Sequence, residues 1–266
     1  MATATAEQVL VGYDSAVALV RARVQMYADL VWSGSSSYHD SDVDRIVAQI
    51  APKVQAGQLQ IANLTSAYIA SAASVRRGER IMPVPVNPEV TRGRGVPAIE
   101  VYRRPAKTLY RELSKGKTFD VALAAGASRL GDLVMMDLQM AKVRQASASY
   151  SATGAQFYGR VLTGLKNCAL CVIASTQRYR SGDLMPIHPG CNCGVKELED
   201  GAEEQTLDLD LLRDTHEQVE KFGGASDSGG RAPDYRQMIV TREHGEYGPT
   251  LTWRDQKFTG PDDLAA

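Results

Sequence analysis

The stretch Cys168–Cys193 reads CALCVIASTQRYRSGDLMPIHPGCNC and holds all four cysteines of the 266-residue chain, together with one of its four histidines. The cysteines form a Cys-x2-Cys pair and a Cys-x-Cys pair, and the histidine lies three residues before the second pair. Short-spaced thiolates let two small loops close around one tetrahedral ion, as in structural zinc sites. The pattern therefore predicts a zinc site with five candidate ligands for four positions: Cys168, Cys171, His188, Cys191 and Cys193.

The expected role of this site follows from its ligands, because protein side chains would fill all four positions around the ion. The four cysteines would complete a four-thiolate site, while His188 could replace one of them or orient a ligand from behind. A closed set leaves no position for a water molecule, and the chain has no HExxH motif to supply a base. Zinc is therefore expected to stabilise a local fold. A reduced, metal-free knuckle and a disulfide pair are the alternatives.

The overall composition sets broad limits. With 44% hydrophobic residues, 23% charged residues and a net charge of −1, the chain can bury a core and lacks the basic excess of a dedicated nucleic-acid-binding protein. Its first residues, MATATAEQ, contain no basic region followed by an apolar run, and no stretch reaches eighteen apolar residues. Neither a signal peptide nor a membrane partner is expected, and cysteines outside a secretory route more often bind metal than form disulfides.

Helical periodicity dominates the first 150 residues. Apolar side chains at three- and four-residue spacing predict a helix over residues 6–32. A second stripe, over residues 46–68, predicts two helices or one bent helix, because Pro52 and Gly57 interrupt it. The Ala, Gly and Ser content of residues 122–131 indicates that another helix packs closely against that segment.

Capping residues mark where these helices begin. Ser41 or Asp42 is the expected N-cap of the second stripe. Helical pattern returns over residues 99–113, and Thr118 is expected to cap a further helix that continues through residue 141. No cluster of acidic and basic residues suited to catalysis accompanies these helices, so we expect them to provide a docking surface.

A proline-rich segment interrupts the helices at residues 81–97. Its four prolines and alternating valines exclude a continuous helix and predict an extended, exposed arm. It lies in a basic part of the chain, residues 76–117, with eleven Lys or Arg against four Asp or Glu. A solvated face or a contact with an acidic protein explains this charge most simply. A nonspecific contact with DNA phosphates is the alternative, through Arg92, Arg94, Arg103 and Arg104.

The pattern changes near residue 150. Phe157–Leu162 and Gly194–Lys196 predict short strands beside the cysteine knuckles. A helix is expected at residues 207–222 and a flexible, low-complexity stretch at residues 223–234. Residues 245–249 suggest either a hairpin or an extended tail.

These patterns predict a mainly α N-terminal region followed by a small α+β zinc-knuckle module and a flexible C-terminal tail. The expected limits are residues 1–150 for the helical region, with the extended arm at 81–97, and residues 151–222 for the Cys/His module. Residues 223–266 are expected to form a flexible linker and tail.

The knuckles and their flanks resemble the MuF-like family of phage minor head proteins. That family has a Cys-x2-Cys knuckle, a loop containing Gly and Tyr, and a Pro-x-His-x2-Cys-x-Cys close. The matching residues here are Cys168, Cys171, Arg178-Tyr179, Pro186, His188, Cys191 and Cys193. Gly159-Arg160-Val161 and Cys193-Gly194-Val195 also look like the family, and the match covers roughly residues 140–200. The helical region and the REHGEYGP tail look like versions from phages of actinobacteria.

The resemblance implies a virion or procapsid component, assembled in the host cytoplasm, that acts at the portal vertex in head assembly or genome delivery. Its expected partners are the portal protein and the capsid or scaffold protein. Similar proteins are often labelled capsid maturation proteases, so processing of scaffold or capsid protein is the alternative function. A nonspecific DNA-binding ejection protein is the second alternative.

A protease would need a nucleophile, a base and an orienting group. His39 lies beside Ser35–Ser37 and Asp40, but neighbours in sequence do not form a triad, and this stretch is better explained as a turn with a helix cap. His244 is better explained as part of a polar turn, and His216 as a surface or core-edge residue. An enzymatic role is therefore not favoured.

Overall fold

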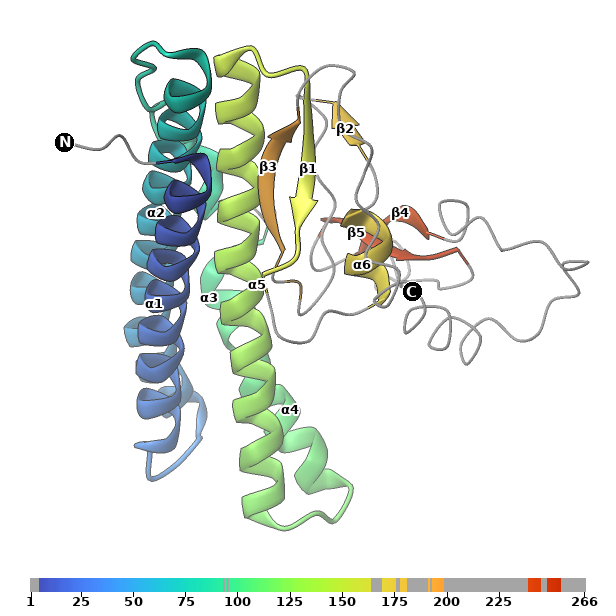
Figure 1. Cartoon of the computed structure of the whole chain (residues 1–266). Helices are drawn as coiled ribbons and strands as arrows, with labels where there is room; N and C mark the ends of the chain where they lie inside the picture. The colour runs from blue at the N-terminus through green and yellow to red at the C-terminus, as the bar shows by residue number, and fades with distance from the viewer. Residues whose placement is uncertain are drawn as a thin grey trace, which may run out of the picture. The chain divides into compact units, whose positions relative to one another are not determined.

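The computed structural model describes residues 5–92, 94, 96–163, 169–175, 178–180, 191, 193–198, 239–244 and 248–254. The chain divides into two compact units, Met1–Ser149 and Tyr150–Ala266. Long helices make up the first unit, and short strands with one short helix make up the described part of the second (Figure 1). The predicted fold class, a mainly helical region followed by small strands with a cysteine cluster, is confirmed.

Helix α1 spans Ala6–Ser33, as its apolar periodicity predicts. Thr5 and Gln8 form a capping box, in which each side chain accepts a hydrogen bond from the other residue's backbone N–H. This exchange satisfies two of the amides that a helix N-terminus leaves without partners. The buried face of α1 includes Tyr13 and Val24, so the helix is held by packing along its apolar stripe.

Helix α2 spans Asp40–Arg77 as one continuous helix with Pro52 inside it. A proline within a helix costs about 3 kcal/mol, whereas each fully buried aliphatic side chain contributes about 1.5–3 kcal/mol. Ile46 and Ile50 before the proline, and Ile61 after it, are at most 4% exposed. Burial on both sides of Pro52 therefore outweighs the lost backbone hydrogen bond.

The predicted cap of α2 is wrong by two or three residues, because His39 occupies the N-cap position. Asp42 lies in the first turn, where its carboxylate accepts hydrogen bonds from the His39 backbone N–H at 3.1 Å and from the Ser37 hydroxyl. A carboxylate at this position reaches back to the unpaired amide of the cap, so Asp42 completes the helix start from inside the helix.

Two glycines allow helices to approach closely in the first unit. A Cβ added at Gly57 of α2 would lie 2.7 Å from Val24 Cγ2 and 3.0 Å from Leu138 Cδ2. A Cβ at Gly126 of α5 (Phe119–Thr153) would lie 2.5 Å from a ring carbon of Trp32. The close packing expected around residues 122–131 is thus confirmed, and Gly57, rather than breaking α2, admits side chains of α1 and α5.

The described residues of the proline-rich segment form no α-helix, as predicted, but the segment is anchored to the helices and is not a free arm. It leads through the 3-10 helix η1 (Pro88–Thr91) to α3 (Ala98–Tyr102) and α4 (Arg104–Ser114). The Ser66 hydroxyl of α2 donates a hydrogen bond to Val84 O at 2.6 Å, and Val90 is fully buried against α2 and α5. Polar anchors on both helices satisfy backbone groups that the prolines leave without internal partners.

The interior of the helical unit also contains polar groups. The Tyr13 hydroxyl and the Thr65 hydroxyl are 2.9 Å apart, and Tyr13 stacks on Tyr68 with ring centroids 4.4 Å apart. Lys142 of α5 is 1% exposed and places its Nζ 5.8 Å from the centroid of the Tyr13 ring. Because buried polar groups must meet their partners, these contacts favour one register between the three helices.

Three strands form an antiparallel sheet in the second unit. Strand β1 (Phe157–Val161) is central, between β2 (Arg178–Arg180) and β3 (Gly194–Leu198). In this register Tyr158 is opposite Tyr179, and Arg160 is opposite Val195. The strands predicted at Phe157–Leu162 and Gly194–Lys196 are confirmed, and the short helix α6 (Ala169–Ser175) lies between β1 and β2 in the chain.

Part of the predicted flexible tail is an ordered hairpin. Strands β4 (Ile239–His244) and β5 (Gly248–Trp253) pair antiparallel, and Ile239 and Leu251 pack with Ile173 of α6 in a buried cluster. Thr250, Leu251 and Thr252 are at most 4% exposed, so β5 is buried on both faces, which an extended tail would leave exposed. The helix predicted at residues 207–222 and the flexible stretch at 223–234 lie outside the described residues.

Candidate metal centre

Three of the predicted ligands meet in the second unit. Cys171 comes from α6, Cys193 directly precedes β3, and Cys191 lies two residues earlier. All three side chains are buried, their Sγ atoms lie within 4.8 Å of one another, and none is in a disulfide. Three thiols gathered in this way can hold a metal ion.

One distance fits tetrahedral coordination closely. The Sγ atoms of Cys171 and Cys191 are 3.8 Å apart, although the residues are twenty positions apart in the chain. Four sulfurs at about 2.3 Å from a tetrahedral ion are separated by about 3.8 Å from one another. Cys168 and His188, the two other predicted ligands, lie outside the described residues.

The sheet places an arginine and a tyrosine on the cysteine side. Side chains alternate along a strand, so Tyr158 and Arg160 share one face of β1. Tyr179 of β2 stacks on Tyr158 with centroids 5.5 Å apart, and the Arg160 guanidinium carbon lies 5.6 Å from the centroid of the Tyr179 ring. The Tyr179 hydroxyl donates to Ala174 O at 3.0 Å, which ties α6 to the same face.

Arg160 lies in the Gly159-Arg160-Val161 stretch that resembles the family, but the sequence patterns assigned it no role at the metal site. It is 3% exposed, and burial lowers the pKa of its guanidinium, but Tyr179 and the three cysteines together raise that pKa by more. One feature of the sequence could have identified Arg160: a charged residue stands inside the short apolar strand FYGRV, two residues after Tyr158 and therefore on the same face as that buried side chain. Such a residue in a buried strand needs a specific partner.

The protonation of Cys193 argues against a nucleophilic role. A contact with Cys171 lowers the pKa of this thiol. A contact with Cys191 and burial together raise it by more, so that the pKa is about 12. Reactive cysteines are partly exposed thiolates with lowered pKa values. As a free thiol, Cys193 is therefore protonated at neutral pH, and the three gathered thiols can hold a metal ion.

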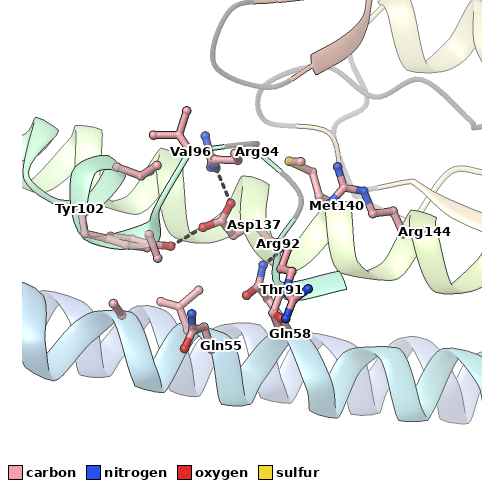
Figure 2. Close-up of a pocket in the computed structure, with 14 residues that line it drawn as sticks. Gln55, Gln58, Thr91, Arg92, Arg94, Val96, Tyr102, Asp137, Met140 and Arg144 are labelled. Atoms are coloured by element: carbon pink, nitrogen blue, oxygen red, sulfur yellow. Dashed lines mark hydrogen bonds and ion pairs between the residues drawn. The ribbon is translucent and has the colours of Figure 1, made fainter. Parts of the chain in front are cut away.

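The predicted DNA-contacting arginines are not gathered on an arm. Arg94 makes an ion pair with Asp137, and its side chain is only 4% exposed (Figure 2). Arg103 is paired with Asp44 at 2.5 Å on the surface. Arg92 is exposed, whereas Arg104 begins α4. Arg94 cannot reach a phosphate without breaking its buried ion pair.

Of the three histidines considered for proteolysis, His39 and His244 lie in regular structural elements. Ser37 donates to Asp42 and His39 is the N-cap of α2, which confirms the turn with a helix cap. His244 ends strand β4, and His216 lies outside the described residues.

No protein-family model matches this chain, and no curated protein or solved structure is detectably similar to it. Among the described residues, no helix is both long enough and apolar enough to cross a bilayer.

Proposed function

We propose that this chain is a structural minor head protein of a phage, of the MuF-like kind, which acts at the portal vertex in head assembly or genome delivery. The observation that carries the proposal is the convergence of Cys171, Cys191 and Cys193, because these residues also carry the resemblance to that family. In this role the helical unit contacts the portal protein and the capsid or scaffold protein, and the metal centre stabilises the second unit.

We propose that the metal is zinc. Thiolates are soft ligands that calcium and magnesium do not select, and the 3.8 Å separation of two sulfurs fits a tetrahedral zinc–thiolate site. Either Cys168 or His188 supplies the fourth ligand, which closes the site against water. A closed zinc site stabilises the fold around it and carries out no hydrolysis, so the role is structural.

An exposed apolar stripe on α1 is our candidate for the portal contact. Leu19, Met26 and Leu30 are 50%, 67% and 68% exposed. They are spaced by seven and four residues, so they share one face of the helix. Leu30, Tyr27 and Ile46 help to line an open hollow of about 470 Å³ between α1, α2 and their connecting loop. Apolar side chains of this size beside a hollow are typical of a protein docking surface.

The stripe can be tested with the portal protein of the same phage. Co-expressed portal protein should co-purify with the wild-type chain and be lost when Met26→Glu and Leu30→Glu are combined. Val121→Glu, at an exposed apolar residue of α5, is the matched control and should leave the contact intact. Retention of the portal protein by the double variant would remove the stripe from the proposal.

The decisive test of the function is the position of this chain in purified particles. A minor head protein should be present in a few copies at one vertex of the procapsid or virion, which quantitative mass spectrometry and cryo-electron microscopy can measure. Absence from both procapsids and virions would contradict the proposal. Clean cleavage of scaffold protein on co-expression, lost on mutation of a serine or histidine, would favour the protease alternative.

The metal has its own test. The purified, reduced protein should contain one zinc ion by native mass spectrometry, and Cys191→Ser should lose it and selectively unfold the region of residues 155–200. Hydrogen exchange can localise that unfolding, and the helices of the first unit should keep their protection. A wild-type protein without bound metal would remove zinc from the proposal.

A second candidate function, nonspecific DNA binding, is favoured by a basic hollow in the first unit. Four of its five lining residues are cationic, and three of these lie on one face of α4 at spacings of three and four residues. The lining residues are Arg104, Lys107, Thr108, Arg111 and Arg129. Clustered cations of this kind bind phosphates through electrostatic attraction that weakens with salt.

Retention on nonspecific duplex DNA tests this second candidate. At low salt, the combined variant Lys107→Ala and Arg111→Ala should bind more weakly than the wild type, and its binding should depend less steeply on salt, by about one unit of slope per lost phosphate contact. Arg23→Ala, an exposed arginine of α1, is the matched control. Equal salt dependence in all three proteins would exclude the hollow as a DNA site.

A further inference from the structure

Among the described residues, none of the three guanidinium nitrogens of Arg160 makes a hydrogen bond of normal geometry, and the residue is 3% exposed. The Tyr179 side chain is close enough to interact with the guanidinium, but a single hydroxyl cannot satisfy three nitrogens. The contact of Arg160 with the Tyr179 ring supplies a cation–π attraction. Burying a charged group costs more than one such contact returns, so the ring alone does not offset the burial of this charge.

The cysteine cluster is the neighbour that can supply the missing acceptors. Arg160 is opposite Val195 in the sheet, and Cys193 precedes Val195 by two residues, so the strand alternation places Cys193 on the side of Arg160. The Sγ atoms of Cys171, Cys191 and Cys193 lie within 4.8 Å of one another, so the three thiols gather on that side. Three neutral thiols would leave the positive charge without compensation.

A thiolate-bound metal changes that balance. A zinc ion with four thiolates carries an excess of two negative charges, and one with three thiolates and a neutral imidazole carries an excess of one. In both cases a net negative centre lies beside a buried cation. Metal-bound thiolates also accept hydrogen bonds, so the guanidinium fork can donate to more than one sulfur.

We infer that Arg160 is the positioning residue of the metal centre, where its guanidinium donates hydrogen bonds to the metal-bound thiolates and balances their negative charge. This inference rests on the proposed metal centre and adds a residue outside the cysteine motif to it. Tyr179 supports Arg160 from the ring side, and β1 and β2 hold both residues against the cysteines. Side chains of the sheet, as well as the cysteines, therefore surround the metal centre.

Cobalt(II) titration of the reduced, full-length apo-protein tests the inference. Cobalt(II) occupies tetrahedral thiolate sites and has a sulfur-to-cobalt charge-transfer band that reports on the electrons of the bound sulfurs. Arg160→Leu should weaken cobalt binding at least tenfold, because partners behind metal ligands contribute about 10- to 100-fold to affinity. The band should move to longer wavelength, since hydrogen bonds stabilise the sulfur electrons.

Two further variants separate charge, geometry and folding. Arg160→Lys keeps the charge but loses the planar fork, so its affinity and band should lie between those of the wild type and Arg160→Leu. Arg178→Leu is the matched control, because Arg178 is opposite Gly159 and therefore on the other face of the sheet, above Phe157. It should bind cobalt as the wild type does.

The outcomes distinguish this inference from the metal centre itself. A wild-type protein that does not bind cobalt overturns both. Wild-type affinity and an unshifted band in Arg160→Leu overturn the role of Arg160 and leave the metal centre standing. If Arg160→Leu does not fold, Arg160→Lys decides: weaker binding with a shifted band supports the inference, and wild-type behaviour overturns it.

Discussion

Arg94 and Asp137 form a buried ion pair, with Nε and Oδ1 2.5 Å apart and both side chains at most 10% exposed. The Tyr102 hydroxyl donates to the other oxygen of Asp137 at 2.6 Å (Figure 2). Removing one member of such a pair leaves a buried charge without compensation. Asp137→Ala should therefore lower the free energy of unfolding of the helical unit by about 3–5 kcal/mol, measured by urea denaturation followed by circular dichroism.

Replacing both members provides the control for that prediction. Arg94→Met combined with Asp137→Leu removes both charges together and should cost much less than Asp137→Ala, because buried pairs can often be exchanged for apolar residues. Arg92→Met, at an exposed neighbour, should change stability by no more than about 0.5 kcal/mol. Equal losses of unfolding free energy in Asp137→Ala and Arg92→Met would show that the Arg94–Asp137 pair does not stabilise the helical unit.

Gly57 and Gly12 should respond to alanine with opposite signs. A Cβ at Gly57 would lie 2.7 Å from Val24 Cγ2, so Gly57→Ala should overpack the interface and destabilise the unit by about 1–3 kcal/mol. A Cβ at Gly12 would meet no atom within 4 Å, so Gly12→Ala should stabilise α1 by about 0.5–1 kcal/mol. Thermal melts of the two variants measure both, and a stabilising Gly57→Ala would contradict the packing described for the three helices.

Gln145 should hold the proline-rich segment in place. This fully buried side chain accepts a hydrogen bond from Asn87 N at 2.8 Å and donates one to Pro85 O at 3.2 Å. Gln145→Ala leaves both backbone groups without these partners, at about 1–3 kcal/mol each. Trypsin should then cleave after Arg80 and Arg92 faster than in the wild type, as mass spectrometry of the fragments would show.

An exposed glutamine of α2 offers the comparison for this cleavage experiment. Gln60→Ala should leave the cleavage rates at the proline-rich segment unchanged, because Gln60 is on the exposed side of its helix. Equal cleavage in the wild type and Gln145→Ala would restore the exposed arm that the prolines alone suggest.

Local sequence patterns were sufficient to predict the helices and strands that bury one apolar face. The apolar stripe of α1 and the short apolar runs of β1 and β3 each reflect a repeat that only one regular structure can bury. The path of residues 81–97 was not predictable in this way. Prolines require extended backbone, but the contact with Gln145 depends on a polar side chain about sixty residues further along the chain.

The site was predictable to the same extent. Short-spaced cysteines converge on one ion by geometry alone, so the motif indicated that Cys171, Cys191 and Cys193 meet. Arg160 has no spacing rule that links it to them, because its position depends on strand register and on the stacking of Tyr179. Contacts fixed by tertiary structure, rather than by local pattern, are those that sequence reasoning missed.

Tyr68 should make the helical unit sensitive to alkaline pH. Burial, with a smaller contribution from the nearby Asp14, raises the pKa of its hydroxyl to about 12. An unfolded tyrosine has a pKa of about 10, so its stabilising contribution is fully present below pH 10 and is lost as the pH rises toward 12. A shift of about two units corresponds to about 2–3 kcal/mol. Urea denaturation at pH 8 and pH 11.5 should show a steeper loss of stability in the wild type than in Tyr68→Phe, and parallel losses would place the ionisation of Tyr68 outside the buried interface.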